Sequence, residues 1–446
     1  MSFSAATLHA VLRDHVPAGA SGFVVALSGG GDSAALLAAM TAPGNDFFTL
    51  PLRAVHIDHG LQSAAAEFRQ ACKTLCAQLR IPLSVVSVAV DVDAGVSIEA
   101  AARDARYAAL AAQLKPKECL LTAHHRRDQA ETVLLQALRG AGAKGMSAMP
   151  VCRPLGAGWH LRPVLDCSQS ELLHFGAHLA CVPLIDPMNE DLRFDRSFLR
   201  HRIWPLMEQR WPGAEMALSR TARHMADAQE LLDLSASRDL ARLRDGDALL
   251  IPGLRALAEL ARVNAVRLWL SEAQVEPPST ARLSEALRQM LEAEVDQLPA
   301  VVWGGHALRR YRHRLFLTGA TPPRLAQARQ WVPLSDSRVD LGPNLGYLTL
   351  EARLGGIAVE ALQGTLNVRR RDGGEALKPA RMARTQSLQH LCQSLGVLPW
   401  MRDALPLLYA NDELVAVADL WADARRCSPE GTPGFAVKWR DGPIIV

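Results

Sequence analysis

The chain has 446 residues, 49% of them hydrophobic, and its 49 basic and 46 acidic residues give a formal net charge of +3. This length predicts about three domains, and the apolar content is ample for packed cores. The small net charge neither requires nor excludes nucleic acid as a partner, because the clustering of charge matters more than its sum.

Cysteine usage and hydropathy exclude several classes of protein. The eight cysteines are scattered without a CxxC or CxxH pair, which argues against a zinc ribbon or a disulfide scaffold and fits a reducing compartment. The N-terminal segment lacks the apolar region of a signal peptide, and no apolar stretch is long enough for a transmembrane helix. We therefore expect a cytoplasmic protein without a membrane partner.

Residues 22–139 alternate between strand-like and helix-like segments. Strands are predicted at 23–27, 52–57, 83–89 and 119–123, and helices at 33–40, 65–80 and 98–114. This alternation indicates right-handed βαβ units and a parallel sheet covered on both faces. Ligands of such sheets bind beyond the carboxyl ends of the strands. Because Ser28, Asp58 and His124 follow strand ends, we expect them to share one rim.

The segment Ser28–Ser33 (SGGGDS) joins the first predicted strand to the first predicted helix. Its glycines let backbone N–H groups converge on an anion at a helix N-terminus, and the two serine hydroxyls add donors. The segment lacks the lysine of a Walker A loop. It predicts a phosphate cradle of a different kind, and an ordinary glycine-rich turn is the less favoured alternative. A carboxylate beside phosphates, here Asp32, indicates an intervening magnesium ion.

A second polar segment, residues 122–132, follows the fourth predicted strand and opens a helix. Asp128 and Glu131 have the spacing of a capping box, with Asp128 as the N-cap and Glu131 at the third helical position. Two carboxylates beside His124 and His125 on the ligand rim exceed what capping needs. The sequence therefore also predicts a site for a cationic amine.

Several further residues leave two interpretations open. His56, near the end of the second strand, either contacts nucleotide or belongs to a polar loop, and taken alone the loop is favoured. Arg103 and Arg106 share a helical face that either binds phosphate or carboxylate groups or is simply solvated. The densest basic clusters, 309–314 and 369–371, suit RNA phosphates or an exposed strand face.

The pattern changes after about residue 198. Helical periodicity dominates to about residue 291, with a turn at 277–280, and short strand candidates follow, among them 348–350, 414–418 and 434–439. The predicted fold class is α/β, with an N-terminal parallel-sheet nucleotide-binding domain, a helical domain and a small C-terminal α+β domain. We place these domains at residues 1–205, 206–320 and 321–446.

These motifs resemble those of a known family. The segment 28–33 matches the SGGxDS signature of the N-type ATP pyrophosphatases, the PP-loop family. Along nearly its whole length the chain is similar to the bacterial tRNA(Ile)-lysidine synthetases. The matching segments are 28–33, 56–61, 99–107, 122–132, 139–145, 162–163, 186–189, 196–200, 371–374 and 399–407. Ser197 departs from this pattern, since the family usually has asparagine there, and we expect at most a weaker local hydrogen bond.

The resemblance implies an ATP-dependent ligase. ATP adenylates the 2-oxygen of the wobble cytidine in an isoleucine tRNA with a CAU anticodon, and pyrophosphate leaves. The amine of free L-lysine then attacks C2 and expels AMP, which forms lysidine and changes the tRNA from methionine to isoleucine identity. ATP and Mg²⁺ are the implied cofactors. Another PP-loop tRNA-modifying enzyme, such as a thiolase, is the alternative, and the absence of paired cysteines disfavours it.

The resemblance also implies roles for individual residues. The ATP site comprises Ser28, Gly29, Gly30, Gly31, Asp32, Ser33 and His56, with magnesium at Asp32. Asp128 and Glu131 hold the lysine, and His124 or His125 accepts its proton. The candidates that position the α-phosphate and the base are Arg103, Arg106, Arg196 and Arg200. The tRNA-binding candidates are Arg369, Arg370, Arg371, Lys378, Arg381 and Arg384. The oligomeric state stays open, with a homodimer as one option.

Overall fold

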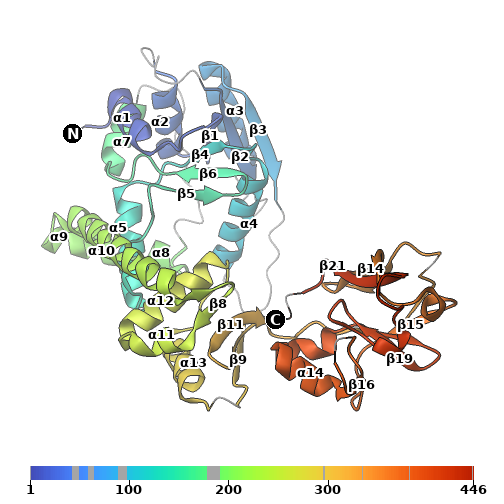
Figure 1. The fold of residues 1–446 in the computed structure, drawn as a ribbon. Helices are drawn as coiled ribbons and strands as arrows, with labels where there is room; N and C mark the ends of the chain where they lie inside the picture. Colours follow the sequence, from blue (N-terminus) through green and yellow to red (C-terminus); the bar gives the residue numbers. More distant parts are fainter. Residues whose placement is uncertain are drawn as a thin grey trace. The chain divides into compact units, whose positions relative to one another are not determined.

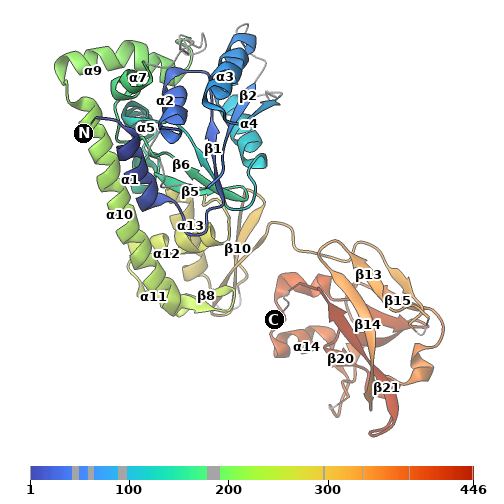
Figure 2. The ribbon, with the colours of Figure 1, turned by 90° about the horizontal axis from the view of Figure 1, so that it is seen from above.

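The computed structural model describes residues 2–42, 50–58, 65–88, 98–177, 191–294, 297–333, 335–380, 382–443 and 445, with the backbone alone for 98–100. The chain forms two compact units, residues 1–232 and 233–446. Figures 1 and 2 show the elements of each unit from two directions. The boundary between the units falls within one long helix, α10 (Ala214–Leu243). The domain limits at 205 and 320 stay predictions.

The first unit is built on a six-stranded sheet of order β3-β2-β1-β4-β6-β5. Its strands are β1 (Gly22–Ala26), β2 (Leu52–Asp58), β3 (Leu83–Ser87), β4 (Glu118–Leu121), β5 (Cys152–Leu155) and β6 (Gly158–Leu161). The pairs from β3 to β6 are parallel, and β5 is antiparallel to β6. The predicted parallel sheet is thus confirmed. The strand order reverses at β1, the place where such sheets bind ligands.

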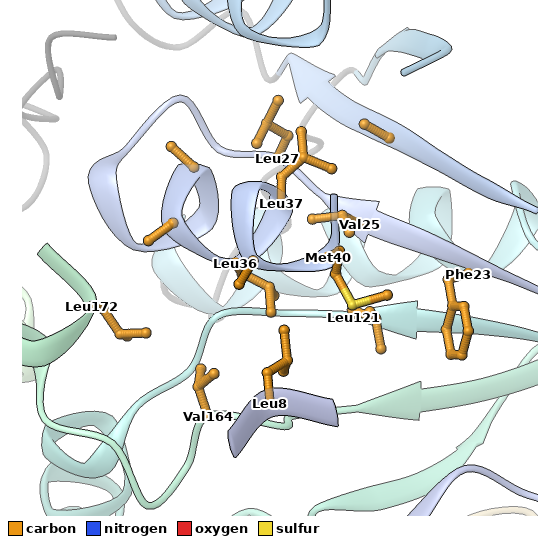
Figure 3. Packing of buried hydrophobic residues seen from close by; sticks show 14 of the residues in the cluster. Leu8, Phe23, Val25, Leu27, Leu36, Leu37, Met40, Leu121, Val164 and Leu172 are labelled. Carbon is orange, nitrogen blue, oxygen red and sulfur yellow. The ribbon is translucent and has the colours of Figure 1, made fainter. Parts of the chain in front are cut away.

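Helices cover both faces of this sheet. They are α1 (Ala5–His15), α2 (Gly31–Met40), α3 (Ala65–Leu79), α4 (Ile98–Ala112) and α7 (Gln169–Gly176). Alternate residues of β1 supply the two cores: Phe23 and Val25 pack with α1, α2, α3 and α7, and Val24 packs with α4. Figure 3 shows the first core around Leu36 and Leu37 of α2. Because α2 is apolar from Ala34 to Met40, it is buried on all sides and its N-terminus is held firmly against the sheet.

The remaining helices of the first unit follow β4 and β6. They are α5 (Arg126–Leu138), α6 (Ala143–Met146), α8 (Asp195–Phe198), the π-helical turn η2 (Leu199–Ile203), α9 (Trp204–Arg210) and the first part of α10. The turn η2 continues α8 directly, so Arg196 and Arg200 lie on one stretch of helical chain. Trp204 is fully buried at the start of α9, and it anchors this stretch in the first unit.

The second unit begins with the helical region that the sequence predicts. Its helices are α11 (Ile251–Ala256), α12 (Glu259–Glu272) and α13 (Thr280–Glu292), and the predicted turn at 277–280 lies between the last two. They pack on a sheet of order β7-β8-β11-β10-β9. The strands of this sheet are β7 (Arg244–Asp245), β8 (Ala248–Leu250), β9 (Ala300–Trp303), β10 (His306–Tyr311) and β11 (Arg314–Gly319).

The rest of the second unit is rich in strands. Its sheets have the orders β12-β15-β18-β19-β20, β13-β14-β21 and β16-β17. The strands are β12 (Arg329–Trp331), β13 (Val339–Gly342), β14 (Gly346–Leu354), β15 (Leu366–Arg369), β16 (Ala376–Leu377), β17 (Gln386–Ser387), β18 (Leu407–Ala410), β19 (Glu413–Val417), β20 (Trp421–Ala422) and β21 (Pro433–Arg440). Helix α14 (Leu388–Leu395) and the 3₁₀ turns η3 (Val359–Leu362), η4 (Pro399–Ala404) and η5 (Ala424–Arg426) complete it. The predicted strands at 348–350 and 434–439 are confirmed as parts of β14 and β21, and the strand predicted at 414–418 is confirmed up to Val417, where β19 ends. No helix in the described ranges is long and apolar enough to cross a membrane.

Glycine at position 158 lets β6 lie against β4. A Cβ atom at this position would stand 2.0 Å from the carbonyl oxygen of Glu118, which belongs to the backbone and cannot turn away. We expect Gly158→Ala to lower the free energy of unfolding by about 3 kcal/mol. Chemical denaturation measures this change. Gly213→Ala is the control, because a Cβ atom there meets nothing within 4 Å; equal stability of the two variants would contradict the close approach.

Candidate active site

A cavity of about 250 Å³ lies at the carboxyl ends of β1, β2 and β4. Its lining from the strand ends and the following loops comprises Ala26, Leu27, Ser28, Asp32, Ser33, Val55, His56, Ile57, Asp58, Thr122, Ala123 and His124. Helices α3 and α4 add Ala65, Phe68, Arg106, Tyr107 and Leu110. The prediction that Ser28, Asp58 and His124 share one rim is therefore confirmed.

The loop between β1 and α2 has the geometry of an anion cradle. Gly29 has φ +87°, and a Cβ atom on it would lie 2.7 Å from Cδ1 of Phe68. The Ser33 hydroxyl accepts from the backbone N–H of Ser28 at 3.2 Å and lies 3.0 Å from the Ser28 hydroxyl. Gly30 is the N-cap of α2 and no side chain caps this end. The first N–H groups of α2 are thus left for a ligand.

Asp32 lies in the first turn of α2, and one of its carboxylate oxygens has no hydrogen-bond partner among the described residues. Its Oδ2 accepts from Nε2 of Gln169 at 3.2 Å and lies 3.7 Å from Nε2 of His125. Its Oδ1 is buried and has no hydrogen-bond partner among the described residues. Burial raises the pKa of Asp32, and His125 opposes that change. A desolvated oxygen beside a phosphate cradle fits a divalent cation that takes its other ligands from phosphate and water.

His56 contributes an imidazole whose orientation is fixed by the backbone. Its Nδ1 lies 2.8 Å from the carbonyl oxygen of Leu27, so Nδ1 carries a proton and donates it. In the neutral ring the lone pair is therefore on Nε2. Asp58, at the end of the same strand, is buried and forms an ion pair with Arg69 of α3. Residues 59–61, the rest of the segment 56–61 that resembles the family, lie outside the described residues.

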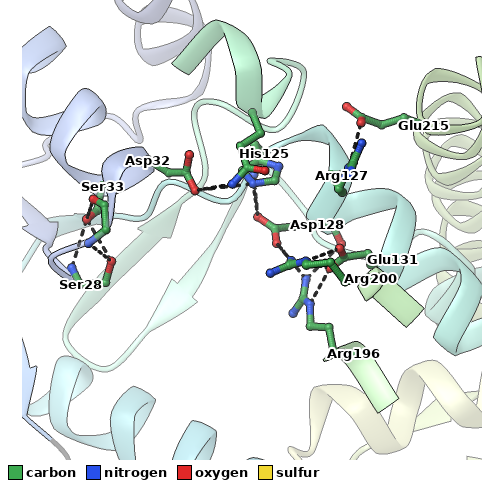
Figure 4. A network of polar contacts seen from close by, with 12 residues as sticks. Ser28, Asp32, Ser33, His125, Arg127, Asp128, Glu131, Arg196, Arg200 and Glu215 are labelled. Atoms are coloured by element: carbon green, nitrogen blue, oxygen red, sulfur yellow. Dashed lines mark hydrogen bonds and ion pairs between the residues drawn. The ribbon is translucent and has the colours of Figure 1, made fainter. Parts of the chain in front are cut away.

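Two carboxylates and two arginines form a partly buried charge cluster beside the cavity. Glu131 is fully buried, and its Oε1 accepts from Nε of Arg200 at 2.9 Å. Its Oε2 accepts from Nε of Arg196 at 2.9 Å and from Nη2 of Arg200 at 2.8 Å. Asp128 Oδ1 completes the cluster, at 3.2 Å from Arg196 and 3.4 Å from Arg200. Figure 4 shows the contacts running from Asp32 through His125 to Asp128 and the arginines.

The predicted capping box at Asp128 is wrong. Helix α5 begins at Arg126, so its N-cap is His125 and Asp128 is the third helical residue. The Asp128 carboxylate accepts the backbone N–H of His125 at 3.0 Å. Burial opposes ionisation of Asp128, but His125, Arg196 and this backbone N–H outweigh it and hold its pKa below the usual range. Glu131 lies about one turn further into the helix, so it does not cap the N-terminus and instead pairs with Arg196 and Arg200.

The other predicted arginines lie on α4, around an aromatic ring. The guanidinium carbons of Arg103 and Arg106 each lie 5.5 Å from the ring centroid of Tyr107, as does that of Arg153. Arg106 lines the cavity, and its Nε is buried without a hydrogen-bond partner within the described part of the chain. The structure thus brings Arg106 to the cavity and Arg196 and Arg200 to the carboxylates.

Sequence reasoning missed Tyr107, His160 and Gln169 as site residues. Tyr107 lines the cavity, and Gln169 reaches Asp32 from α7, 137 positions along the chain. His160 is fully buried on β6, and its Nε2 lies 2.8 Å from the Thr122 hydroxyl. The signal for His160 was its spacing of two from Arg162, which directly follows β6, since residues two apart along extended chain share a face.

The predicted tRNA-binding residues belong to the second unit. Arg369 lies at the end of β15, 4.9 Å from the ring centroid of Tyr409, and Arg370 is half-exposed. Arg371 and Lys378 are partly exposed, and Arg384 is exposed. Arg381 lies outside the described residues.

The arginines of the other basic cluster, residues 309–314, contact groups of the second unit itself. The buried Arg310 donates to the carbonyl oxygens of Met290 and Ala293 at the end of α13. Arg309 donates to Ala320, and Arg314 pairs with Asp245. These arginines therefore hold β10 and β11 in place.

Comparisons with known proteins agree with this arrangement. A PP-loop domain model matches residues 3–207, a TilS substrate binding domain matches 249–316, and a TilS substrate C-terminal domain matches 366–439. The tRNA(Ile)-lysidine synthase of Alkalilimnicola ehrlichii is 42% identical over 90% of this chain and 90% of that protein. The enzyme of the same name from Coxiella burnetii is 37% identical, over 94% and 92%.

The chain belongs to the tRNA(Ile)-lysidine synthase family. The resemblance that the sequence motifs indicate is thereby confirmed over nearly the full length of both relatives. Among solved structures, the U34-tRNA thiolase NcsA of Methanococcus maripaludis covers 50% of this chain and 78% of its own, with 16% identity and a TM-score of 0.41. That likeness is too slight to bear on function.

The charge cluster of Asp128, Glu131, Arg196 and Arg200 leads to a prediction about the stability of this family member. Glu131→Gln leaves two arginines against one carboxylate in a buried place, so we expect the free energy of unfolding to fall by about 3 kcal/mol. Glu208→Gln is the control, because Glu208 pairs with Arg127 at the surface and should contribute less than about 1 kcal/mol. Urea denaturation of both variants tests this, and a loss for Glu131→Gln as small as that of the control would contradict it.

Proposed function

We propose that this protein joins L-lysine to C2 of the wobble cytidine in isoleucine tRNA with a CAU anticodon, in an ATP-dependent reaction through an adenylated tRNA. The observation that carries this proposal is the continuity of the site. A phosphate cradle at 28–33 is connected through Asp32 and His125 to the Asp128–Glu131 carboxylates. Membership of the tRNA(Ile)-lysidine synthase family supports the same reaction.

In the first step, charge develops on the departing pyrophosphate. The backbone N–H groups at the start of α2 and the hydroxyls of Ser28 and Ser33 are in place to hold it. Asp32 fits a magnesium ion, which when bound supplies positive charge between the carboxylate and the phosphates. Arg106, which lines the cavity from α4, is suited to the α-phosphate.

In the second step, a cationic lysine must be held and deprotonated. Asp128 and Glu131 supply the negative charge, but Arg196 and Arg200 already occupy their oxygens. Binding of the lysine ammonium would therefore exchange one cation for another at a site whose charges balance without it. His125 lies 3.6 Å from Asp128 and 3.7 Å from Asp32, where it is suited to accept the proton that the amine loses.

The alternative, tRNA thiolation, requires a reactive cysteine. Burial raises the pKa of Cys119 to about 12 and that of Cys76 and Cys167 to about 11, which suppresses their thiolates. The chain also has no CxxC pair. Ligation of an amine is therefore the favoured chemistry.

The decisive experiment supplies the protein with ATP, magnesium, labelled lysine and unmodified isoleucine tRNA. We expect label in the tRNA, together with AMP and pyrophosphate. A tRNA with the wobble cytidine replaced by uridine is the control. Release of ADP in place of AMP, or label that is indifferent to the wobble base, would contradict the proposed reaction.

Asp32 gives a sharper test of the nucleotide half of the site. We expect Asp32→Ala to reduce tRNA-dependent pyrophosphate release by about 100-fold or more, because charge on the leaving group is no longer balanced. The exposed Asp14→Ala on α1 is the matched control. Circular dichroism establishes that both variants are folded. Pyrophosphate release by Asp32→Ala at the rate of the control would remove Asp32 from the site.

The C-terminal arginines are tested through salt dependence. Replacement of Arg369, Arg370 and Arg371 by alanine should weaken tRNA binding. It should also flatten the plot of log K against log salt concentration by about 2, as expected for three lost phosphate contacts. Filter binding at several salt concentrations measures this slope. Arg288→Ala, on the exposed face of α13, is the control; a slope unchanged in the triple variant would place the RNA elsewhere.

A further inference from the structure

A chain of hydrogen bonds behind the cavity connects Arg162 to His124. Nη2 of Arg162 lies 3.1 Å from Nδ1 of His160, and Nε2 of His160 lies 2.8 Å from the Thr122 hydroxyl. That hydroxyl lies 2.7 Å from Nδ1 of His124. Arg162, His160 and Thr122 are all buried. Thr122 and His124 line the cavity, and His124 keeps part of its surface exposed.

The directions of these hydrogen bonds follow from the first member of the chain and from the acceptors within reach of Thr122. A guanidinium only donates, so Nδ1 of His160 accepts and the ring proton of His160 must be on Nε2. The Thr122 oxygen accepts a hydrogen bond from that N–H. Among the described residues, Nδ1 of His124 is the one acceptor within reach of the Thr122 O–H, so this hydroxyl donates to His124. Nδ1 of His124 is therefore an acceptor, and the neutral ring carries its proton on Nε2.

The surroundings keep both rings neutral. Burial lowers the pKa of His124 to about 3 and that of His160 to about 2. The charges of Arg162, Arg196 and Arg106 contribute to this lowered pKa of His124, and the carboxylate of Asp128 opposes it. Burial lowers the pKa of Arg162 only to about 10, so the guanidinium keeps its charge at neutral pH and its role as donor.

We propose that His124 is a neutral hydrogen-bond donor, through Nε2–H, to an anionic oxygen of the nucleotide in the cavity. Thr122, His160 and Arg162 are positioning residues that fix this tautomer. Within the described residues Nε2 of His124 has no hydrogen-bond partner, and Ser28 and Ser33 of the phosphate cradle line the same cavity. This inference rests on the proposed function for the identity of the ligand, but the tautomer itself does not.

The inference changes the role that the sequence suggests for His124. A base needs a lone pair facing the substrate, and the lone pair of His124 is taken by Thr122 on the side away from Nε2. A fixed neutral donor instead stabilises charge as it develops and needs no reorganisation when the reaction occurs. The proton of the lysine amine is then left to His125.

Ring-nitrogen chemical shifts in protein containing isotope-labelled histidine test the tautomer directly, with His124→Gln used to assign the signal. We expect His124 to be protonated at Nε2 and unprotonated at Nδ1 from about pH 6 to about pH 8. Thr122→Ser keeps the hydroxyl and should keep His124 protonated at Nε2. Thr122→Val removes the hydroxyl and should allow both neutral tautomers of His124. A proton on Nδ1 in the unaltered protein, or a pattern indifferent to Thr122→Val, would overturn the inference whatever reaction the enzyme catalyses.

Kinetics of two variants test what the donor does. His124→Ala removes the donor and should lower kcat about 100-fold with little change in the KM for lysine. His124→Gln restores an N–H near the Nε2 position but has no basic lone pair, so it should recover kcat to within about tenfold of the unaltered enzyme. If glutamine is as inactive as alanine, and both lose the acidic limb of the pH–rate profile, His124 is a base and the inference fails. Thermal melts of both variants confirm that they are folded.

Discussion

Negative charge taken out of water at one edge of the sheet is the constraint on which the first unit depends. Asp58 and Glu131 are buried at this edge, and each is compensated by arginine from another helical segment: Arg69 of α3 for the first, and Arg196 with Arg200 for the second. These ion pairs hold α3 and the α8–η2 stretch against the strand ends, since a buried carboxylate without a partner is costly. Asp32 departs from the rule, because one of its oxygens has no partner among the described residues.

The difference between Asp32 and Glu131 separates two kinds of site. Around Glu131 the charges balance within the protein, so a cationic substrate gains little unless an arginine moves away. Around Asp32 the balance is incomplete, so a cation that enters with the phosphates is favoured from the start. On this basis we propose that the nucleotide site is ready before substrate binds and that the lysine site forms by exchange of cations. The π-helical turn that carries Arg200 is a local irregularity of the kind often found at functional sites.

Local signals predicted the frame of the site, and contacts distant in sequence completed it. The strand–loop–helix around Ser28–Ser33 was predictable, because its glycines and the apolar β1 and α2 act within one short segment. The start of α5 was misplaced, because His125 is a poor N-cap by composition and the helix begins three residues before the expected first helical residue. The partners of Glu131 are 65 and 69 positions away, and nothing within α5 indicates them. His160 entered the site through the pairing of β6 with β4, a register that only the folded sheet establishes.

The two histidines that line the cavity have opposite hydrogen-bonding roles at Nε2. His56 donates from Nδ1 to the Leu27 carbonyl, so its neutral ring offers a lone pair at Nε2. His124 accepts at Nδ1 from Thr122, so it offers a proton at Nε2. Both polarities are set by groups of the protein and not by the ligand. Under the proposed function, a nucleotide would meet one acceptor and one donor in fixed positions. It would have to bring a hydrogen-bond donor to the first and an oxygen to the second, which would constrain its orientation before any bond is broken.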